Sequence, residues 1–211
     1  LIGDLINSSL VIEDNGVIAI NFNDNTPDEK ACLFLKNKFK NIDLAMLNYN
    51  AGGPYPSCFD NLSIDEKKIE SERIAQRNLE HACKMISVLK PKSVLPFAGA
   101  YIIGGKNYYK NEYLGTSTWD ECADYLSKNL KISSKVFCLR ENQSYDIKNQ
   151  KQLDKYEKLD TDEMNIYIDS LKDEKYDYEN DHMPEINKLK KEINLASVRF
   201  TERVKKFNID L

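Results

Sequence analysis

The sequence predicts an α/β fold, because short apolar runs of strand length alternate with longer amphipathic segments of helical period. Its 211 residues are 41% hydrophobic and 30% charged, which is ordinary for a globular protein with one sizeable core. Two loops between residues 43 and 105 are rich in glycine, proline and tyrosine, and each follows a predicted buried strand. Open α/β sheets place their sites at such strand ends, so this region is the predicted site.

Composition excludes several classes of function. The formal net charge of −4 argues against a nucleic-acid-binding surface, which would be basic. The longest apolar runs have only strand length, so no membrane span is expected. The first residues, LIGDLINSS, lack the charged region and cleavage site of a secretion signal. The five cysteines have no paired spacing and are expected to be free thiols, which is typical of a cytoplasmic protein.

A β-hairpin is predicted first. Residues 8–13 and 17–23 show the partial apolar alternation of strands, and Asn15-Gly16 between them is a strong hairpin signal. The second strand ends in the polar run NFNDN, which includes Asp24. Carboxamides and a carboxylate at a strand end fit either the edge of a site or a turn held by Asx hydrogen bonds.

A helix and a buried strand follow. Thr26 is the expected N-cap of the helix and Pro27 its first residue, with an end near residue 40. The strand at 42–47 contains four consecutive apolar residues, which is typical of burial on both faces. The loop after it, NYNAGGPYP, carries two glycines that allow close approach to a ligand and two prolines that stiffen the chain. We expect it to line a site, although a plain wide turn would use the same residues.

The long helix of the chain begins at a capping box formed by Ser63 and Glu66, and it is expected to end near residue 89. His81 falls on its charged face together with Arg73 and Arg77, so we expect this histidine to be solvated rather than a ligand. The chain contains only two histidines, so any metal site must be rich in carboxylates or take ligands from elsewhere.

A second buried strand, at 93–97, ends in the second glycine-bearing loop. Gly104 and Gly105, followed by Lys106, could hold an anionic group in this loop. The spacing of a phosphate-binding P-loop is incomplete, so the signal is weak.

The remaining elements complete the α/β alternation. Thr118 and Glu121 form another capping box, at the start of a helix that reaches about residue 130. Strands are predicted at 135–139 and 145–147, and helices at 160–171 and 184–207. The last helix carries an apolar stripe at helical spacing, as expected for a helix docked on an apolar surface.

The composition shifts to Lys, Gln and Asp over 148–158, as in a linker or an exposed excursion. We therefore expect one domain over residues 1–147 and a helical extension over 148–211.

Three motifs in this order resemble the second half of a metallo-β-lactamase-fold protein: SSLVIEDNGVIAINFND, DLAMLNYNAGGPYP and KPKSVLPFAG. Within that superfamily they are most similar to the branch of CMP-N-acetylneuraminate hydroxylase and its bacterial relatives in surface-sugar metabolism. The resemblance covers roughly residues 8–147. It implies half of an αββα sandwich, with a C-terminal helical extension.

The resemblance also implies a divalent metal, which would be zinc, iron or manganese. Asp24 matches the family aspartate that follows the second strand and contributes to the metal site. The HxHxDH cluster of the family's first half does not occur here. We therefore expect a fragment whose metal is bound mainly by residues outside this chain, and which needs its N-terminal half or a second copy as partner.

The implied function is that of a hydrolase or oxygenase acting on a sugar-nucleotide or surface-polysaccharide precursor, with no catalytic residue assigned in this chain. Its expected substrate-binding residues are Tyr49, Gly52, Gly53, Tyr55, Tyr101, Gly104, Gly105 and Lys106. One alternative is a non-catalytic binding or scaffold domain with a degenerate metal site. Another is an interaction module in the last sixty residues.

Overall fold

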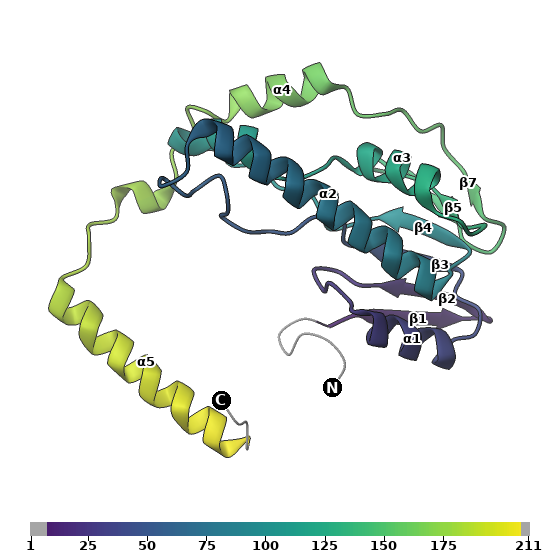
Figure 1. The fold of residues 1–211 in the computed structure, drawn as a ribbon, viewed down its shortest axis with the longest axis horizontal. Coiled ribbons are helices and arrows are strands. Elements are labelled where there is room, and N and C mark those ends of the chain that lie inside the picture. Colours follow the sequence, from purple (N-terminus) through teal and green to yellow (C-terminus); the bar gives the residue numbers. More distant parts are fainter. Residues whose placement is uncertain (1–7, 208–211) are drawn as a thin grey trace. The chain divides into compact units, whose positions relative to one another are not determined.

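The structure is a computed structural model that describes residues 8–207. Over these residues the chain divides into two compact units, one ending at Asp173 and the other beginning at Glu174. The first unit combines a mixed β-sheet with several helices (Figure 1), which confirms the α/β class. The predicted domain boundary between residues 147 and 148 stays a prediction.

Within the described residues, five strands form one sheet in the order β1-β2-β3-β4-β5. The pair β1 (Leu10–Asp14) and β2 (Val17–Asn21) is antiparallel. The strands β3 (Leu44–Leu47), β4 (Ser93–Pro96) and β5 (Lys135–Val136) continue the sheet in parallel. The carboxyl ends of β2, β3 and β4 therefore meet at one edge, as the sequence predicts for the loops after β3 and β4.

The β1–β2 turn has the predicted chemistry. Asn15 and Gly16 have φ angles of 47° and 79°, and the strands pair directly from Asp14 to Val17. A type I′ turn requires positive φ at both central residues, and asparagine followed by glycine adopts such angles at low cost.

Three helices connect the strands: α1 (Glu29–Lys38), α2 (Ile64–Leu89) and α3 (Trp119–Asn129). Both predicted capping boxes are present, one at the start of α2 and the other at the start of α3. The prediction that Thr26 caps α1 is wrong. The carboxylate of Asp28 accepts a hydrogen bond from the Ala31 N–H at 2.7 Å, so α1 begins only at the next residue.

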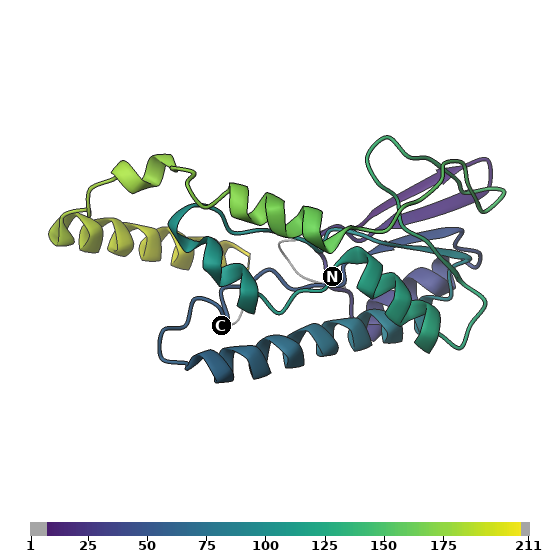
Figure 2. The ribbon, with the colours of Figure 1, turned by 90° about the horizontal axis from the view of Figure 1, so that it is seen from above.

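The three helices pack on one face of the sheet (Figures 1 and 2). The buried strand residues of this face are Ile20, Ala45, Leu47 and Val94. The opposite face has a smaller core around Phe137, whose ring stacks on Tyr145 with 3.7 Å between ring centroids. Tyr145 belongs to a separate two-stranded hairpin of β6 (Tyr145–Asp146) and β7 (Lys151–Gln152). The side chains of Leu10 and Ile12, in β1, are about half exposed to solvent.

The segment after β7 is anchored more firmly than its composition indicates. Trp119 donates its indole N–H to the Tyr156 hydroxyl at 2.7 Å, and that hydroxyl donates to Asp120 at 2.8 Å. Most of residues 148–158 are exposed, as expected for an excursion, but Tyr156 anchors the segment to α3. The segment leads into α4 (Thr161–Ser170), and Asp160 caps this helix.

Short 3-10 helices occur at η1 (Gly105–Tyr113) and, in the second unit, at η2 (Asp177–Asn180). The second unit also contains α5 (Ile186–Lys206), whose apolar side chains are mostly exposed. His182, the second histidine of the sequence, is exposed. None of the helices within residues 8–207 has the combination of length and hydropathy that a membrane-spanning helix needs.

Candidate functional site

A hollow of about 570 Å³ lies at the carboxyl edge of the parallel strands. We call it the edge hollow, and its walls come from the segments that follow β2, β3 and β4. Its lining residues are Asp24, Thr26, Asn48, Asn50, Ala51, Gly52, Ala98, Gly99, Ala100 and Tyr101. The fold thus brings together three of the predicted site residues: Asp24, Gly52 and Tyr101.

The polar run after β2 serves two purposes. Asn21 accepts a hydrogen bond from the backbone N–H of Asn23 at 2.8 Å, which forms an Asx turn. Asn25 is buried and donates to the Ser9 hydroxyl at 3.0 Å. Asp24 lies between these anchored residues on the edge hollow, and its exposed carboxylate has no hydrogen-bond or ion-pair partner among residues 8–207. The interpretation as a turn is therefore confirmed, and the interpretation as a site edge stays a prediction.

Asn50 joins the two glycine-bearing regions of the site. Its side-chain amide donates to the carbonyl oxygens of Gly99 and Ser117, and its side-chain oxygen accepts from the Ser117 N–H at 2.8 Å. The residue is only 6% exposed and its hydrogen-bonding groups are occupied, so it positions the loops rather than offering groups to a ligand. Asn48, which also lines the hollow, accepts from the Asn50 N–H at 2.9 Å, and its amide nitrogen has no hydrogen-bond partner among residues 8–207.

Tyr101 links the second loop to the first. Its hydroxyl donates to the Gly53 carbonyl at 3.1 Å, and its ring is about one-third exposed between the edge hollow and a smaller one beside Gly52. A partly exposed aromatic ring at a polar hollow can stack on the face of a sugar or a base.

Tyr49 is less accessible than the sequence suggests. It is 3% exposed, and its ring packs so closely on Gly99 that a Cβ at that glycine would lie 2.5 Å from a ring carbon. Burial raises the pKa of its hydroxyl well above the ordinary value, with smaller contributions from nearby thiols and carboxyls. The ring forms a wall rather than an open stacking platform.

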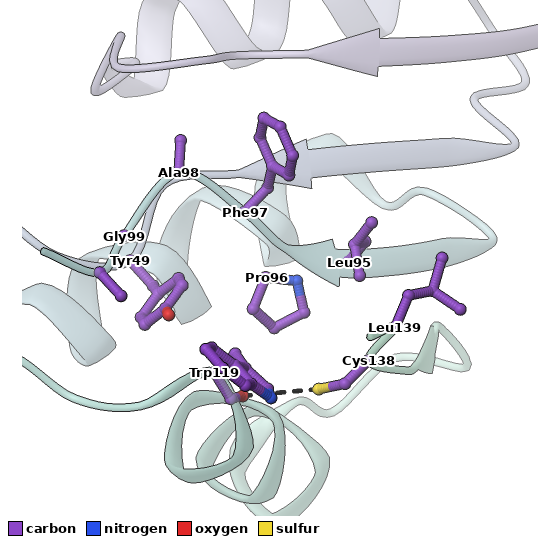
Figure 3. A pocket seen from close by; sticks show the side chains of 10 residues that line it. Tyr49, Leu95, Pro96, Phe97, Ala98, Gly99, Trp119, Cys138 and Leu139 are labelled. Carbon is purple, nitrogen blue, oxygen red and sulfur yellow. Dashed lines mark hydrogen bonds between the residues drawn. The ribbon is translucent and has the colours of Figure 1, made fainter. Parts of the chain in front are cut away.

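Tyr49 also lines a hollow of about 250 Å³ beside β4, shown in Figure 3. Pro96 and Trp119 lie on the same hollow, and the Cys138 thiol contacts the Trp119 carbonyl at 3.6 Å. Burial raises the pKa of this thiol to about 11, so Cys138 stays protonated near neutral pH and is a poor nucleophile.

A further hollow of about 250 Å³ lies between the β3 end and α2. We call it the α2 hollow, and it shares Thr26, Asn48, Asn50 and Ala51 with the edge hollow, so the two adjoin. Its remaining lining residues are Tyr49, Arg77, Asn78 and His81.

The expectation that His81 is simply solvated is wrong. The ring is half-buried, and Nε2 lies 3.0 Å from the carbonyl oxygen of Pro27. Sequence reasoning missed this residue because its partner is 54 positions away in the chain. The sequence did contain one signal for this residue: His81 follows Arg77 by one helical turn, so both side chains lie on the same side of α2.

The other predicted residues lie elsewhere. Tyr55 is exposed and donates to Glu70 at 2.8 Å. Gly104 precedes η1, Gly105 begins it, and the Gly105 N–H already donates to the Leu171 carbonyl at 2.8 Å. Gly104, Gly105 and the exposed Lys106 contribute to none of the hollows described here in residues 8–207, so the structure does not bring them to the edge hollow.

The described residues do not complete a metal centre by themselves. Among residues 8–207, no three His, Cys, Asp or Glu side chains gather where they could hold a metal ion. Asp24 offers one carboxylate, and Thr26 and Asn48 beside it offer neutral oxygens. Such a set is too sparse for zinc, iron or manganese, which need several protein ligands.

No family model matches this chain, and no curated protein or solved structure matches it either.

Proposed function

We propose that the edge hollow binds a small polar ligand of the sugar or nucleotide-sugar class. The observation that carries the proposal is the convergence of Asp24, Asn48 and Tyr101 on one hollow from three different strand ends. A carboxylate, a carboxamide and an exposed ring supply acceptors, donors and a stacking face, which is the set that a hydroxyl-rich ring requires. The carboxyl edge of a parallel sheet is also where α/β folds bind small ligands.

We further propose that the intact protein is a metal-dependent enzyme of the metallo-β-lactamase fold that acts on this ligand. The resemblance of the three motifs supports it, as does the unpartnered Asp24 carboxylate at the expected strand end. The one-sided helical layer supports half of an αββα sandwich, because a second sheet would cover apolar side chains such as Leu10 and Ile12. The remaining metal ligands would belong to residues beyond those described.

Ligand binding is tested by NMR titration of the protein with N-acetylglucosamine and UDP-N-acetylglucosamine. We expect the amide resonances of Asn48, Gly52 and Tyr101 to shift. Tyr101→Ala should weaken binding about tenfold, since aromatic stacking contributes roughly 1–3 kcal/mol. Tyr109→Ala is the matched control, because that tyrosine is 57% exposed and lines none of the hollows described in residues 8–207. Shifts confined to other regions would refute the proposal.

Metal dependence is tested on the intact gene product by elemental mass spectrometry. We expect a stoichiometric zinc, iron or manganese content that falls on Asp24→Ala. The matched control is Asp60→Ala, an exposed loop aspartate. An intact protein that binds the sugar probes without any metal would instead be a non-catalytic binding domain.

A further inference from the structure

The α2 hollow supplies positive charge beside the edge hollow. Arg77 and His81 are one helical turn apart on α2 and both line it, together with the amide of Asn78. The protein as a whole is acidic, with a formal net charge of −4, so the Arg77 charge is a local feature rather than part of a general basic surface.

Arg77 is not committed to any carboxylate of the described residues. Its guanidinium makes only a long contact of 3.5 Å with the Asn78 side-chain oxygen. Arg73, one turn earlier on the same helix, is instead held by Glu70 at 2.6 Å. Two carboxylates of the neighbouring helices are engaged, since Glu29 pairs with Lys84 at 3.0 Å and Glu80 accepts from Gln76 at 2.8 Å. Asp24, on the adjoining edge hollow, has no ion-pair partner among residues 8–207 and does not pair with Arg77. Arg77 therefore keeps its planar set of donors for a ligand.

His81 and Asn78 are the other polar side chains of α2 on this hollow. A carbonyl oxygen can only accept, so the contact with Pro27 uses the proton on His81 Nε2 and fixes the orientation of the ring, and this donor is not free for a ligand. The buried Nδ2 of Asn78 has no acceptor among residues 8–207. Leaving such a donor unpaired is unfavourable, so an acceptor that reached this amide would stabilise the protein.

We propose that the α2 hollow binds the phosphate group of a phosphorylated sugar whose neutral part occupies the edge hollow. This inference rests on the proposed function and adds the charge of the ligand to it. A guanidinium binds phosphate through two parallel hydrogen bonds, which fixes both position and orientation. Arg77 thereby takes the role that the sequence suggested for Lys106.

The test compares two probes that differ in the phosphate, glucose 1-phosphate and methyl α-glucoside, by NMR titration of the intact protein. We expect Arg77→Ala to weaken the binding of glucose 1-phosphate about tenfold, since one charge-assisted pair is lost. The affinity for methyl α-glucoside should change less than about twofold. Arg77→Gln should behave in the same way, and Arg77→Lys should recover only part of the loss. Arg73→Ala is the matched control and should change neither affinity.

Titration with inorganic phosphate separates this inference from the proposed function. Shifts of the His81 and Thr26 resonances that are lost in Arg77→Ala would support the phosphate site even if neither sugar bound. Two results would overturn it: glucose 1-phosphate binding no more tightly than methyl α-glucoside, or equal losses in Arg73→Ala and Arg77→Ala. In the first case the sugar site would stand without a phosphate site. In the second the effect would be general electrostatics.

Discussion

Asn50 and Ser117 are joined by two hydrogen bonds, although 67 residues separate them in the chain. The Asn50 amide donates to the Ser117 carbonyl at 2.7 Å, and the Asn50 oxygen accepts from the Ser117 N–H at 2.8 Å. The same amide donates to the Gly99 carbonyl. One buried side chain therefore fixes the loop after β3 to the loop after β4 and to the start of α3.

Asn50→Ala should lower the free energy of unfolding by about 2–4 kcal/mol, because it leaves buried backbone groups at Gly99 and Ser117 without partners. Urea denaturation followed by circular dichroism measures the change. Asn149→Ala is the control: this exposed side chain bonds only to Asp146, so its loss should cost less than about 0.5 kcal/mol. Equal losses of unfolding free energy in the two variants would show that the Asn50 hydrogen bonds do not hold the loops together.

Gly99→Ala should destabilise the protein by about 1–3 kcal/mol, because the added methyl overlaps the buried ring of Tyr49. Gly53→Ala is the matched control, since a Cβ added at Gly53 would have no other atom within 4 Å. In a Tyr49→Leu background the cost of Gly99→Ala should fall below about 1 kcal/mol, because the smaller side chain gives room. Additive costs in this double-mutant cycle would contradict the predicted overlap.

Much of the first unit could be predicted because the signals are local. Asn15-Gly16 specifies its own turn, and the Ser63 and Thr118 capping boxes mark their helices within four residues. Consecutive apolar residues identify β3 and β4 as buried strands, and parallel order then places their loops at one edge. This is why the loops that contain Gly52 and Tyr101 could be placed at one edge from the sequence, whereas Asp24 was assigned through the family resemblance.

The rest depends on partners that are distant in the chain. The helical pattern places His81 on a charged face, but the Pro27 carbonyl that contacts it belongs to the segment before α1. Gly105 is suited to an anion by residue type, yet its N–H is taken by Leu171. Arg77 was assigned to the solvated face, and only the position of the loop after β3 makes it part of a hollow.

Stability should decline as the pH rises from about 9 to 11. Burial raises the pKa of Cys32 to about 12 and that of Cys138 to about 11, from an ordinary value of 9.0, and nearby carboxylates add to the shift. In this range the unfolded chain has released thiol protons that the folded chain retains. Each thiol therefore contributes a decrease of up to about 1.4 kcal/mol per pH unit.

Urea denaturation at a series of pH values measures this slope. Cys32→Ala and Cys138→Ala should each flatten it, whatever they do to the stability at neutral pH. The control is Cys58→Ala, because that thiol is exposed. If neither Cys32→Ala nor Cys138→Ala altered the slope of unfolding free energy against pH, these two thiols would not be its source.

Tyr156→Phe should lower the free energy of unfolding by about 1–2 kcal/mol, because one hydroxyl satisfies both the Trp119 indole N–H and the buried Asp120 carboxylate. Trp119 is the only tryptophan in the sequence, so its fluorescence reports this contact as well as global unfolding in urea. We expect the folded-state emission to change in Tyr156→Phe and to stay the same in the control Tyr109→Phe, whose side chain is 57% exposed. If stability and emission were unchanged in both variants, the residues after β7 would not be anchored to α3 through this hydroxyl.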